Sequence, residues 1–412
     1  MAAVQGEPEK GNPRSTFSPA FVEENQMRKA TFSLISLLAV LPLPSLRLEA
    51  QTFTVLYTFT GGVDGAFPQA GLVRDKAGNL YGTTVQGGSS PNCFLGCGVV
   101  FKLNASGSET VLHSFTDSPD GAGPASVLLR DKAGNLYGTT NSGGSAFGPG
   151  TVFKVEASGG ETVLYSFAGP PDGANPVHTG LVRDKTGNLY GTTGNGGFLD
   201  NGTVFKVDSS GNETVLHRFT DSGTDGSHPV AGLVMDKAGN LYGTTRDGGS
   251  IGAGTVFKVD ASGNETVLHS FTGLDGSSPF AALVRDRAGN LYGTTFQGGA
   301  FGAGTVFKVD ASGNETVLHS FTGGADGSTP FAPLVRDKEG NLYGTTASGG
   351  SFRNGTVFKV DASGNETVLH SFTGLDGSSP LGGLARDKAD NLYGTTISGD
   401  SSRFGTVFKL TP

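Results

Sequence analysis

The sequence has 412 residues, a net charge of −8, two cysteines and no tryptophan. Its 68 glycines recur at fixed places beside Val, Leu, Tyr and Phe, which excludes a disordered low-complexity chain. The acidic balance and the lack of a basic run argue against nucleic acid or an anionic membrane surface as a partner.

The first predicted element is a leader over residues 1–50. Residues 30–46 form a short apolar stretch that follows two basic residues and precedes the small residue Ala50, as in a secretory signal peptide. Two prolines and the short length argue against a permanent membrane helix. We therefore expect a secreted or periplasmic protein, cleaved after Ala50 and not inserted in the membrane afterwards, with Met27 as an alternative start.

Residues 51–412 consist of one repeat in seven copies. Each copy contains Asn-Leu-Tyr-Gly-Thr-Thr and then a Val-Phe-Lys motif. The repeated tyrosines are Tyr81, Tyr137, Tyr190, Tyr242, Tyr292, Tyr343 and Tyr393. Because a period of about 50 residues with several short strands is typical of propeller blades, we predict an all-β, seven-bladed β-propeller.

Each repeat is predicted to form four strands, named A to D. In the first copy they cover residues 71–75, 79–84, 98–103 and 110–115, all rich in β-branched and aromatic residues. Both faces of a blade are buried, and large side chains on one blade should fill gaps on the next. The A–B and C–D connections are tight hairpins, so the longer B–C and D–A loops share the opposite rim.

The two ends of the repeat region complement each other. The region begins with a D-type strand, Thr54–Phe59, and ends with an A–B–C set at about residues 381–410 that lacks a D strand. We predict that the N-terminal strand closes the ring as the outer strand of the last blade, which removes open sheet edges.

The two cysteines, Cys93 and Cys97, lie in the first B–C loop. In an exported protein such a neighbouring pair favours a disulfide. A metal site is the weaker alternative, because two thiols with no nearby histidine do not make a ligand set.

The recurring GNLYGTT and GTVFK motifs resemble the Gloeo/Verruco (GloVer) tandem-repeat family of secreted bacterial proteins. The resemblance covers residues 52–410 and implies a propeller-like exported protein, with variable C-terminal anchors in the family. We expect no anchor here, because the chain stops directly after a repeat. The strand pattern is also similar, more distantly, to NHL-type propellers, and the resemblance implies no catalytic residues.

Polar residues that could carry chemistry mostly recur with the repeat. Five histidines share one position of strand D with two tyrosines, which favours packing: His113, His217, His269, His319 and His370. His178 and His228 do not recur, and either could face the channel as part of a pair or decorate a loop. We expect no cofactor, with one alternative: seven Asp-Gly aspartates in the D–A loops could form a ring near the channel mouth that binds Ca²⁺.

The B–C loops break the symmetry, so a specific site is expected there. The candidate binding residues are Phe94, Phe147, Phe198, Arg246, Phe301, Phe352, Arg353 and Arg403. Together with Ile251 and Phe404, the phenylalanines would form an apolar collar if exposed. The alternative, which we favour, is that they fold down and seal adjacent blades.

Three functions remain open. The leading hypothesis is a monomeric, non-enzymatic module that binds an extracellular protein or glycan through the B–C/D–A rim. A propeller enzyme, a lyase or hydrolase of extracellular polymers, would need asymmetric polar residues at the channel mouth. A structural protein without a ligand is the third, favoured by the identical segments Gly252–Gly273 and Gly302–Gly323.

Overall fold

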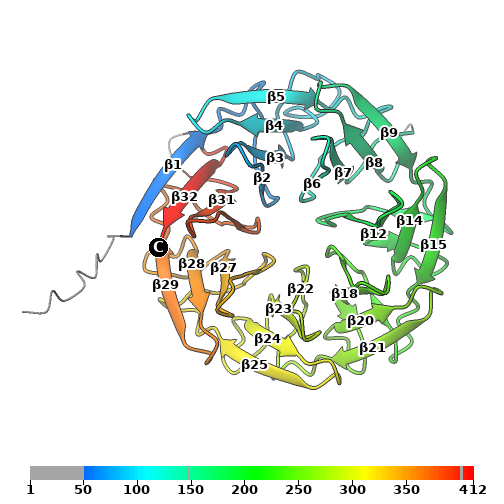
Figure 1. Cartoon of the computed structure of the whole chain (residues 1–412), viewed down its shortest axis with the longest axis vertical. Coiled ribbons are helices and arrows are strands. Elements are labelled where there is room, and N and C mark those ends of the chain that lie inside the picture. Colours follow the sequence, from blue (N-terminus) through cyan, green and yellow to red (C-terminus); the bar gives the residue numbers. More distant parts are fainter. Residues whose placement is uncertain (1–50, 146–147, 400–401) are drawn as a thin grey trace, which may run out of the picture. The chain divides into compact units, whose positions relative to one another are not determined.

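The computed structural model describes residues 51–145, 148–399 and 402–412. The predicted leader and Phe147 lie outside the described residues. The described residues form a ring of seven four-stranded antiparallel sheets around a central channel, and no helix occurs among them (Figure 1). The predicted seven-bladed propeller is confirmed.

The strands nearest the channel, at position A, are only two residues long, shorter than predicted (Figure 1). They are β2 (Val73–Arg74), β6 (Leu129–Arg130), β11 (Val182–Arg183), β17 (Val234–Met235), β22 (Val284–Arg285), β26 (Val335–Arg336) and β30 (Ala385–Arg386). The B strands follow outward: β3 (Leu80–Thr84), β7 (Leu136–Thr140), β12 (Leu189–Thr193), β18 (Leu241–Thr245), β23 (Leu291–Thr295), β27 (Leu342–Thr346) and β31 (Leu392–Thr396).

The C strands lie next: β4 (Val99–Leu103), β8 (Thr151–Val155), β14 (Thr203–Val207), β20 (Thr255–Val259), β24 (Thr305–Val309), β28 (Thr356–Val360) and β32 (Thr406–Thr411). The D strands form the outer wall: β5 (Glu109–Ser114), β9 (Glu161–Ser166), β15 (Glu213–Arg218), β21 (Glu265–Ser270), β25 (Glu315–Ser320), β29 (Glu366–Ser371) and β1 (Thr52–Thr58). Two-residue strands also join loops: β10 (Gly173–Ala174) with β13 (Asn195–Gly196), and β16 (Gly226–Ser227) with β19 (Asp247–Gly248).

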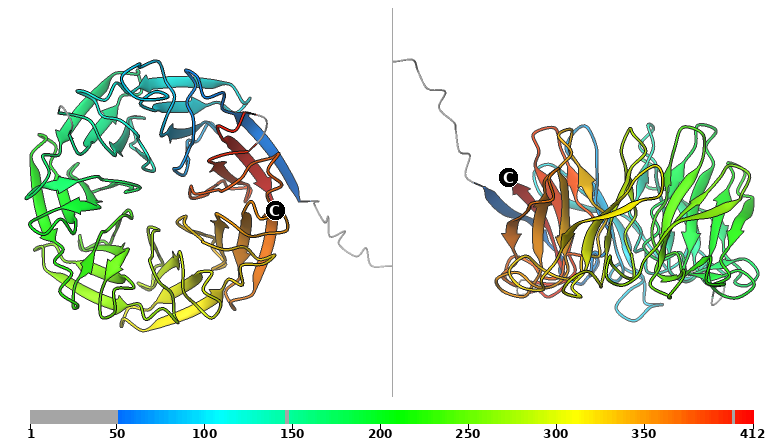
Figure 2. Two further views of the ribbon diagram at one scale, coloured as in Figure 1. Left: turned by 180° about the vertical axis from the view of Figure 1, so that it is seen from behind. Right: turned by 90° about the horizontal axis from the view of Figure 1, so that it is seen from below.

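We number the blades one to seven from β2–β5 onward. Blade seven is built from both ends of the described chain, because its sheet order is β1-β32-β31-β30 (Figures 1 and 2). Thr52 pairs with Thr411 and Thr58 with Thr406, and a bulge falls between Val55 and Tyr57. The D strands of the other blades carry their register shift at the equivalent place, so the predicted closure is confirmed.

Apolar side chains between neighbouring blades form the core. At each interface the phenylalanine that ends strand D meets the strand C phenylalanine of the next blade edge-to-face, as Phe115 does with Phe153 at 5.0 Å. The same contact occurs at the seam, between Phe59 and Phe101. The strand B glycine makes room within the blade, because a Cβ on Gly82 would lie 2.7 Å from the Phe101 ring. The expectation that this gap serves the next blade is therefore wrong.

The Gly-Thr-Thr motif joins the blades by hydrogen bonds. Its first threonine donates to a backbone carbonyl ahead of the next A strand, as Thr192 does to Ala231 at 2.9 Å. Thr395 donates to Ala70 at 3.0 Å and so repeats the bond across the seam. These threonines are buried, and a buried hydroxyl needs such a partner. The motif therefore recurs because every interface needs it.

Candidate functional site

The B–C and D–A loops lie at one rim of the ring, opposite the A–B and C–D hairpins (Figure 2). Backbone bridges tie the two kinds of loop together, for example Ala66 to Gln86 in blade one and Ser277 to Gln297 in blade five. The loops differ in sequence between blades, but these recurring backbone bridges hold their bases in a similar way.

The phenylalanines of these loops are largely exposed. The exposed fractions are 87% for Phe94, 75% for Phe198, 64% for Phe301 and 57% for Phe352. Ile251 takes the same place in blade four at 64%. The sealing interpretation is therefore wrong for these five side chains.

Phe404 in the B–C loop of blade seven does seal, but it directly precedes Gly405 and so takes the place that Ala303 has in blade five. It is partly buried and packs against Phe67 at 5.8 Å between ring centroids. Gly61 makes this possible, because a Cβ there would lie 2.6 Å from the Phe404 ring.

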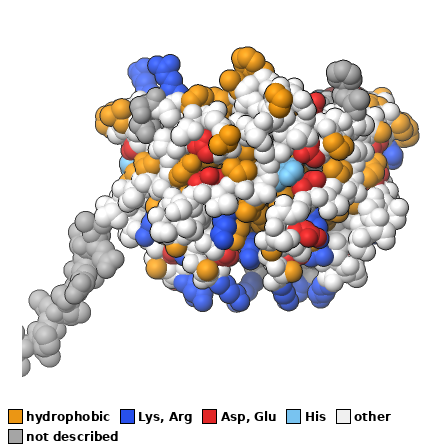
Figure 3. Space-filling view, turned by 90° about the horizontal axis from the view of Figure 1, so that it is seen from above, with side chains coloured by type: hydrophobic (Ala, Val, Ile, Leu, Met, Phe, Trp, Pro, Cys, Tyr) orange, Lys and Arg blue, Asp and Glu red, His pale blue; other side chains and the backbone are white. Residues whose placement is uncertain are grey.

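The D–A loops add aliphatic side chains to the same rim. Val63, Leu274 and Leu375 are 69%, 82% and 80% exposed. Sequence analysis missed them, although each stands beside an Asp-Gly turn where an apolar residue has no strand to join. We call the following residues the apolar rim: Val63, Phe94, Phe198, Ile251, Leu274, Phe301, Phe352 and Leu375. Figure 3 shows hydrophobic side chains projecting from the upper rim, while lysine and arginine gather at the lower one.

A disulfide shapes the most exposed part of the apolar rim. Cys93 and Cys97 are bonded, as predicted. They enclose Phe94, Leu95 and Gly96, and Leu95 takes a φ of 62°. Cys97 is buried, so the bond anchors the loop tip to the blade.

The three candidate arginines differ in their surroundings. Arg246 is paired with Asp247, at 2.6 Å from its Nη2, and is not a free cation. His228 lies 3.3 Å from the same carboxylate and does not pair with His178. Arg353 and Arg403 are exposed, with φ values of 64° and 62°. These two arginines therefore offer positive charge beside the apolar rim.

The channel holds a cavity of about 190 Å³ lined by all seven blades. Glycine and alanine are eight of its seventeen lining residues, because the chain segments ahead of the A strands crowd together. A Cβ on Gly71, for example, would lie 2.7 Å from the carbonyl oxygen of Gly383. His178 is the one titratable side chain among the described residues that line this cavity.

His178 meets aromatic rings from the far side of the channel. Its ring centroid lies 5.2 Å from that of Phe331, which stacks on Phe280 at 4.9 Å. Burial lowers the pKa of His178 to about 4, against the opposing hydrogen bond with the backbone of Ala125. The imidazole is therefore neutral at neutral pH, and the asymmetric polar cluster that an enzyme requires is not found among the described lining residues.

The opposite rim repeats one polar lattice. In every blade the strand B tyrosine donates to the A–B turn aspartate, as Tyr190 does to Asp184 at 3.1 Å. At six interfaces a cationic side chain of the next blade covers the tyrosine, as Arg183 covers Tyr137 at 5.3 Å. Burial alone would raise the pKa of Asp184, but hydrogen bonds from Thr186, Asn188 and Tyr190 lower it to about 2. This rim thus combines hydrogen bonds within each blade with cation–π contacts between blades.

The D–A aspartates lie at the outer wall and not around the channel mouth. Each faces the His or Tyr of its own strand D, as Asp120 faces His113 at 2.9 Å and Asp64 faces Tyr57 at 3.0 Å. The predicted Ca²⁺-binding ring is therefore wrong in its geometry. The strand D histidines carry specific hydrogen bonds or ion pairs as well as packing.

A glutamate of the next blade faces six of these aspartates. Burial, reinforced by the charge of Asp64, raises the pKa of Glu109 to about 7. Burial, reinforced by the charge of Asp172, likewise raises the pKa of Glu213 to about 7. One carboxylate oxygen of each of the six glutamates is buried without a hydrogen bond: Glu109, Glu161, Glu213, Glu265, Glu315 and Glu366. Sequence analysis missed these residues, although their recurrence at the start of strand D was a visible signal.

The repeat profile described as the Gloeobacter/Verrucomicrobia repeat matches residues 44–250 and 232–412. The chain belongs to this family. No curated protein matches the sequence of this repeat protein.

Solved structures share the fold of this family member at low identity. The extracellular domain of a protein described as a hybrid two-component system, BT3049 from B. thetaiotaomicron, has a TM-score of 0.55 and 14% identity, over 88% of this chain and 41% of its own. The extracellular domain of BT4673 from the same organism has a TM-score of 0.56 and 11% identity, over 87% and 39%. The chain thus spans about two fifths of each protein, and the likeness shows the fold alone.

A gluconolactonase, XC5397 from Xanthomonas campestris, has a TM-score of 0.46 and 15% identity, over 89% of this chain and 91% of its own. A score this low supports no inference about activity. The disulfide is consistent with an exported protein. Within the described residues no helical segment has the length and hydropathy needed to cross a membrane.

Proposed function

We propose that the chain is an exported binding module that holds a protein partner on its apolar rim. The observation that carries this proposal is the exposure of the loop phenylalanines, which are 57% to 87% open to solvent. A large exposed apolar patch costs solubility, so it is typical of an interaction surface. The extracellular domains with the same fold support the compartment.

The chemistry of the apolar rim favours a protein over a glycan. Phenylalanine, leucine, isoleucine and valine offer no hydrogen bonds to sugar hydroxyls, and the sequence has no tryptophan to stack on a sugar ring. Aromatic side chains with nearby arginine are typical of protein interfaces. Because Arg353 and Arg403 stand beside the patch, the expected partner presents apolar side chains flanked by carboxylates.

Site-specific photocrosslinking tests the proposal in the cells that export the protein. A photoreactive residue at Phe301 should give one discrete adduct, whereas the same residue at Ala311, exposed in a C–D hairpin of the opposite rim, should give none. Changing Phe94, Phe198 and Phe352 to serine should abolish the Phe301 adduct while the protein stays folded.

The nature of the adduct decides between partners. A protease-sensitive adduct supports a protein partner. An adduct that resists protease but is cleaved by periodate would mean that the partner is a glycan. If Phe301 gives no adduct, or if Ala311 gives the same one, the apolar rim is not the binding surface.

A further inference from the structure

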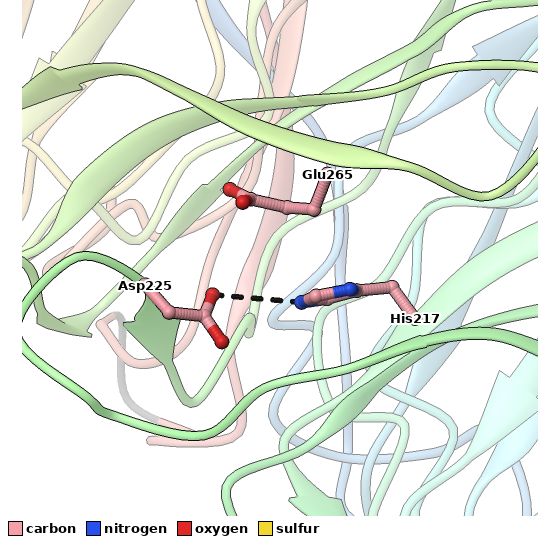
Figure 4. Close-up of side chains that lie close together, drawn as sticks. All are labelled: His217, Asp225 and Glu265. Carbon is pink, nitrogen blue, oxygen red and sulfur yellow. Dashed lines mark ion pairs between the residues drawn. The ribbon is translucent and has the colours of Figure 1, made fainter.

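Three side chains from two blades converge at the outer wall between blades three and four. His217 extends from β15, Asp225 follows in the D–A loop, and Glu265 stands at the start of β21 (Figure 4). One possible ligand atom of each side chain, an imidazole nitrogen or a carboxylate oxygen, lies within 4.8 Å of the ligand atoms of the other two. An imidazole nitrogen and two carboxylates within this reach are the donor set of a divalent metal site.

Two of the three facing atoms make no hydrogen bond, although His217 Nε2 lies within ion-pair distance of Asp225 (Figure 4). His217 Nε2 is buried and makes no hydrogen bond, since the nearest Asp225 oxygen lies 3.5 Å away. Glu265 Oε1 is also buried without a hydrogen bond. Buried polar atoms are nearly always satisfied, and a cation between these atoms would satisfy both.

Asp225 is already held in place for such a role. Its Oδ2 accepts hydrogen bonds from the backbone and the hydroxyl of Thr220, at 2.8 Å and 2.9 Å. Its Oδ1 accepts one from the backbone of Gly226 at 2.8 Å and faces His217. Such outer hydrogen bonds orient a carboxylate ligand before an ion arrives.

The neighbouring cluster provides an internal comparison. His269, Asp275 and Glu315 also lie within 4.8 Å of one another. There, however, His269 Nε2 is hydrogen-bonded to Asp275 at 2.9 Å, which occupies the nitrogen. The D–A loops of the two clusters also differ in length, since the aspartate stands eight residues after His217 but only six after His269.

We propose that His217, Asp225 and Glu265 bind one Zn²⁺ ion, or a similar transition-metal ion, that joins blade three to blade four. The imidazole favours Zn²⁺ over Ca²⁺ and Mg²⁺, which prefer oxygen ligands. Three protein ligands leave a fourth position for water. This site is at the outer wall, so it is independent of partner binding at the apolar rim.

Zn²⁺ titration of the full chain after chelator treatment, followed by calorimetry, tests this site. The H217Y variant is the sharpest probe, because Tyr57 and Tyr165 occupy the same strand position and bond their own aspartates at 3.0 Å and 2.9 Å. It should keep the packing and lose the nitrogen ligand. E265Q keeps the shape and removes the second carboxylate, and H269Y and E315Q are matched controls.

The wild-type chain, H269Y and E315Q should show a saturable Zn²⁺ binding event that H217Y and E265Q lack. Zn²⁺ should also raise the melting temperature of the wild type and H269Y but not that of H217Y, while all four variants remain folded by circular dichroism. Binding that survives in H217Y, or wild-type protein that takes up no Zn²⁺, would overturn the proposal.

Discussion

The two rims of the ring are built from the ends of the same strands but carry different chemistry. At the A–B and C–D rim the same aspartate, asparagine and tyrosine bond one another in every blade. At the opposite rim the loops differ and expose large apolar side chains. One rim is constrained by the need to hold the blades together, and the other is free to carry a function.

The largest expected effect comes from breaking the repeated lattice. Asp337 is buried and accepts hydrogen bonds from the Asn341 backbone and side chain and from the Tyr343 hydroxyl. Because D337A leaves these donors unpaired, we expect a loss of about 2–3 kcal/mol of stability. Thermal and denaturant unfolding measure it. An unchanged midpoint would mean that the hydrogen bonds of the A–B turn do not stabilise the blade.

The disulfide of the apolar rim should matter less. It closes a loop of only a few residues, so the C93S/C97S double variant should lose about 1–2 kcal/mol. The loss should be local, with faster proteolytic cleavage at residues 89–96 and a small fall in melting temperature. The reduced wild-type protein is the control, and cleavage elsewhere in the ring would contradict a local role.

The outer wall between the rims should show a pH signature. The pKa values of Glu109 and Glu213 are raised from the usual 4.5 to about 7. The folded state therefore binds protons that the unfolded state has released. This stabilisation is complete below about pH 4.5 and is lost as the pH rises through about 7.

The melting temperature should accordingly fall between pH 5 and pH 8. The groups that face Glu109 are Asp64 and Tyr57, and those that face Glu213 are Asp172 and Tyr165. The charge of Arg218 lowers the pKa of Glu213 and so acts against the effect of Asp172. The E109Q/E213Q variant cannot release these protons, so its melting temperature should change less over the same range. A wild-type and variant profile with equal slopes would argue against this origin.

The smallest effect on stability is expected at the apolar rim. F94S, F301S and F352S remove exposed side chains, and each should change stability by no more than about 0.5 kcal/mol. The same variants should abolish partner binding. A large destabilisation by F301S would instead favour the sealing role that we first expected, and would weaken the contrast between the rims.

The repeated parts of the fold were predictable because their signals are local and periodic. The unpaired strand at Thr54–Phe59 predicted the closure, and the predicted tight A–B hairpins formed, with Asp390 in the left-handed region at a φ of 67°. The rim was harder. Phe404 directly precedes the glycine that begins strand C and folds down onto Gly61, whereas Phe301 stands three residues before the equivalent Gly304 and stays exposed.

The repeat pattern also could not predict which side chains meet between blades. Glu265 and His217 lie 48 residues apart in the chain and meet only because blades three and four are neighbours. At the interface between blades six and seven, Phe53 stands where the other D strands begin with glutamate, and it stacks on His370 with centroids 3.8 Å apart. This interface therefore replaces the polar contact of the other six interfaces with an aromatic one.

The pairing of β1 with β32 has a mechanical consequence. Thr52 and Thr411 face each other at one end of the strand pair. A force that pulled these two residues apart would break the hydrogen bonds between β1 and β32 one after another, and it would open the ring at blade seven first. The pairing of β1 with β32 is therefore the point at which tension between these two residues would open the ring.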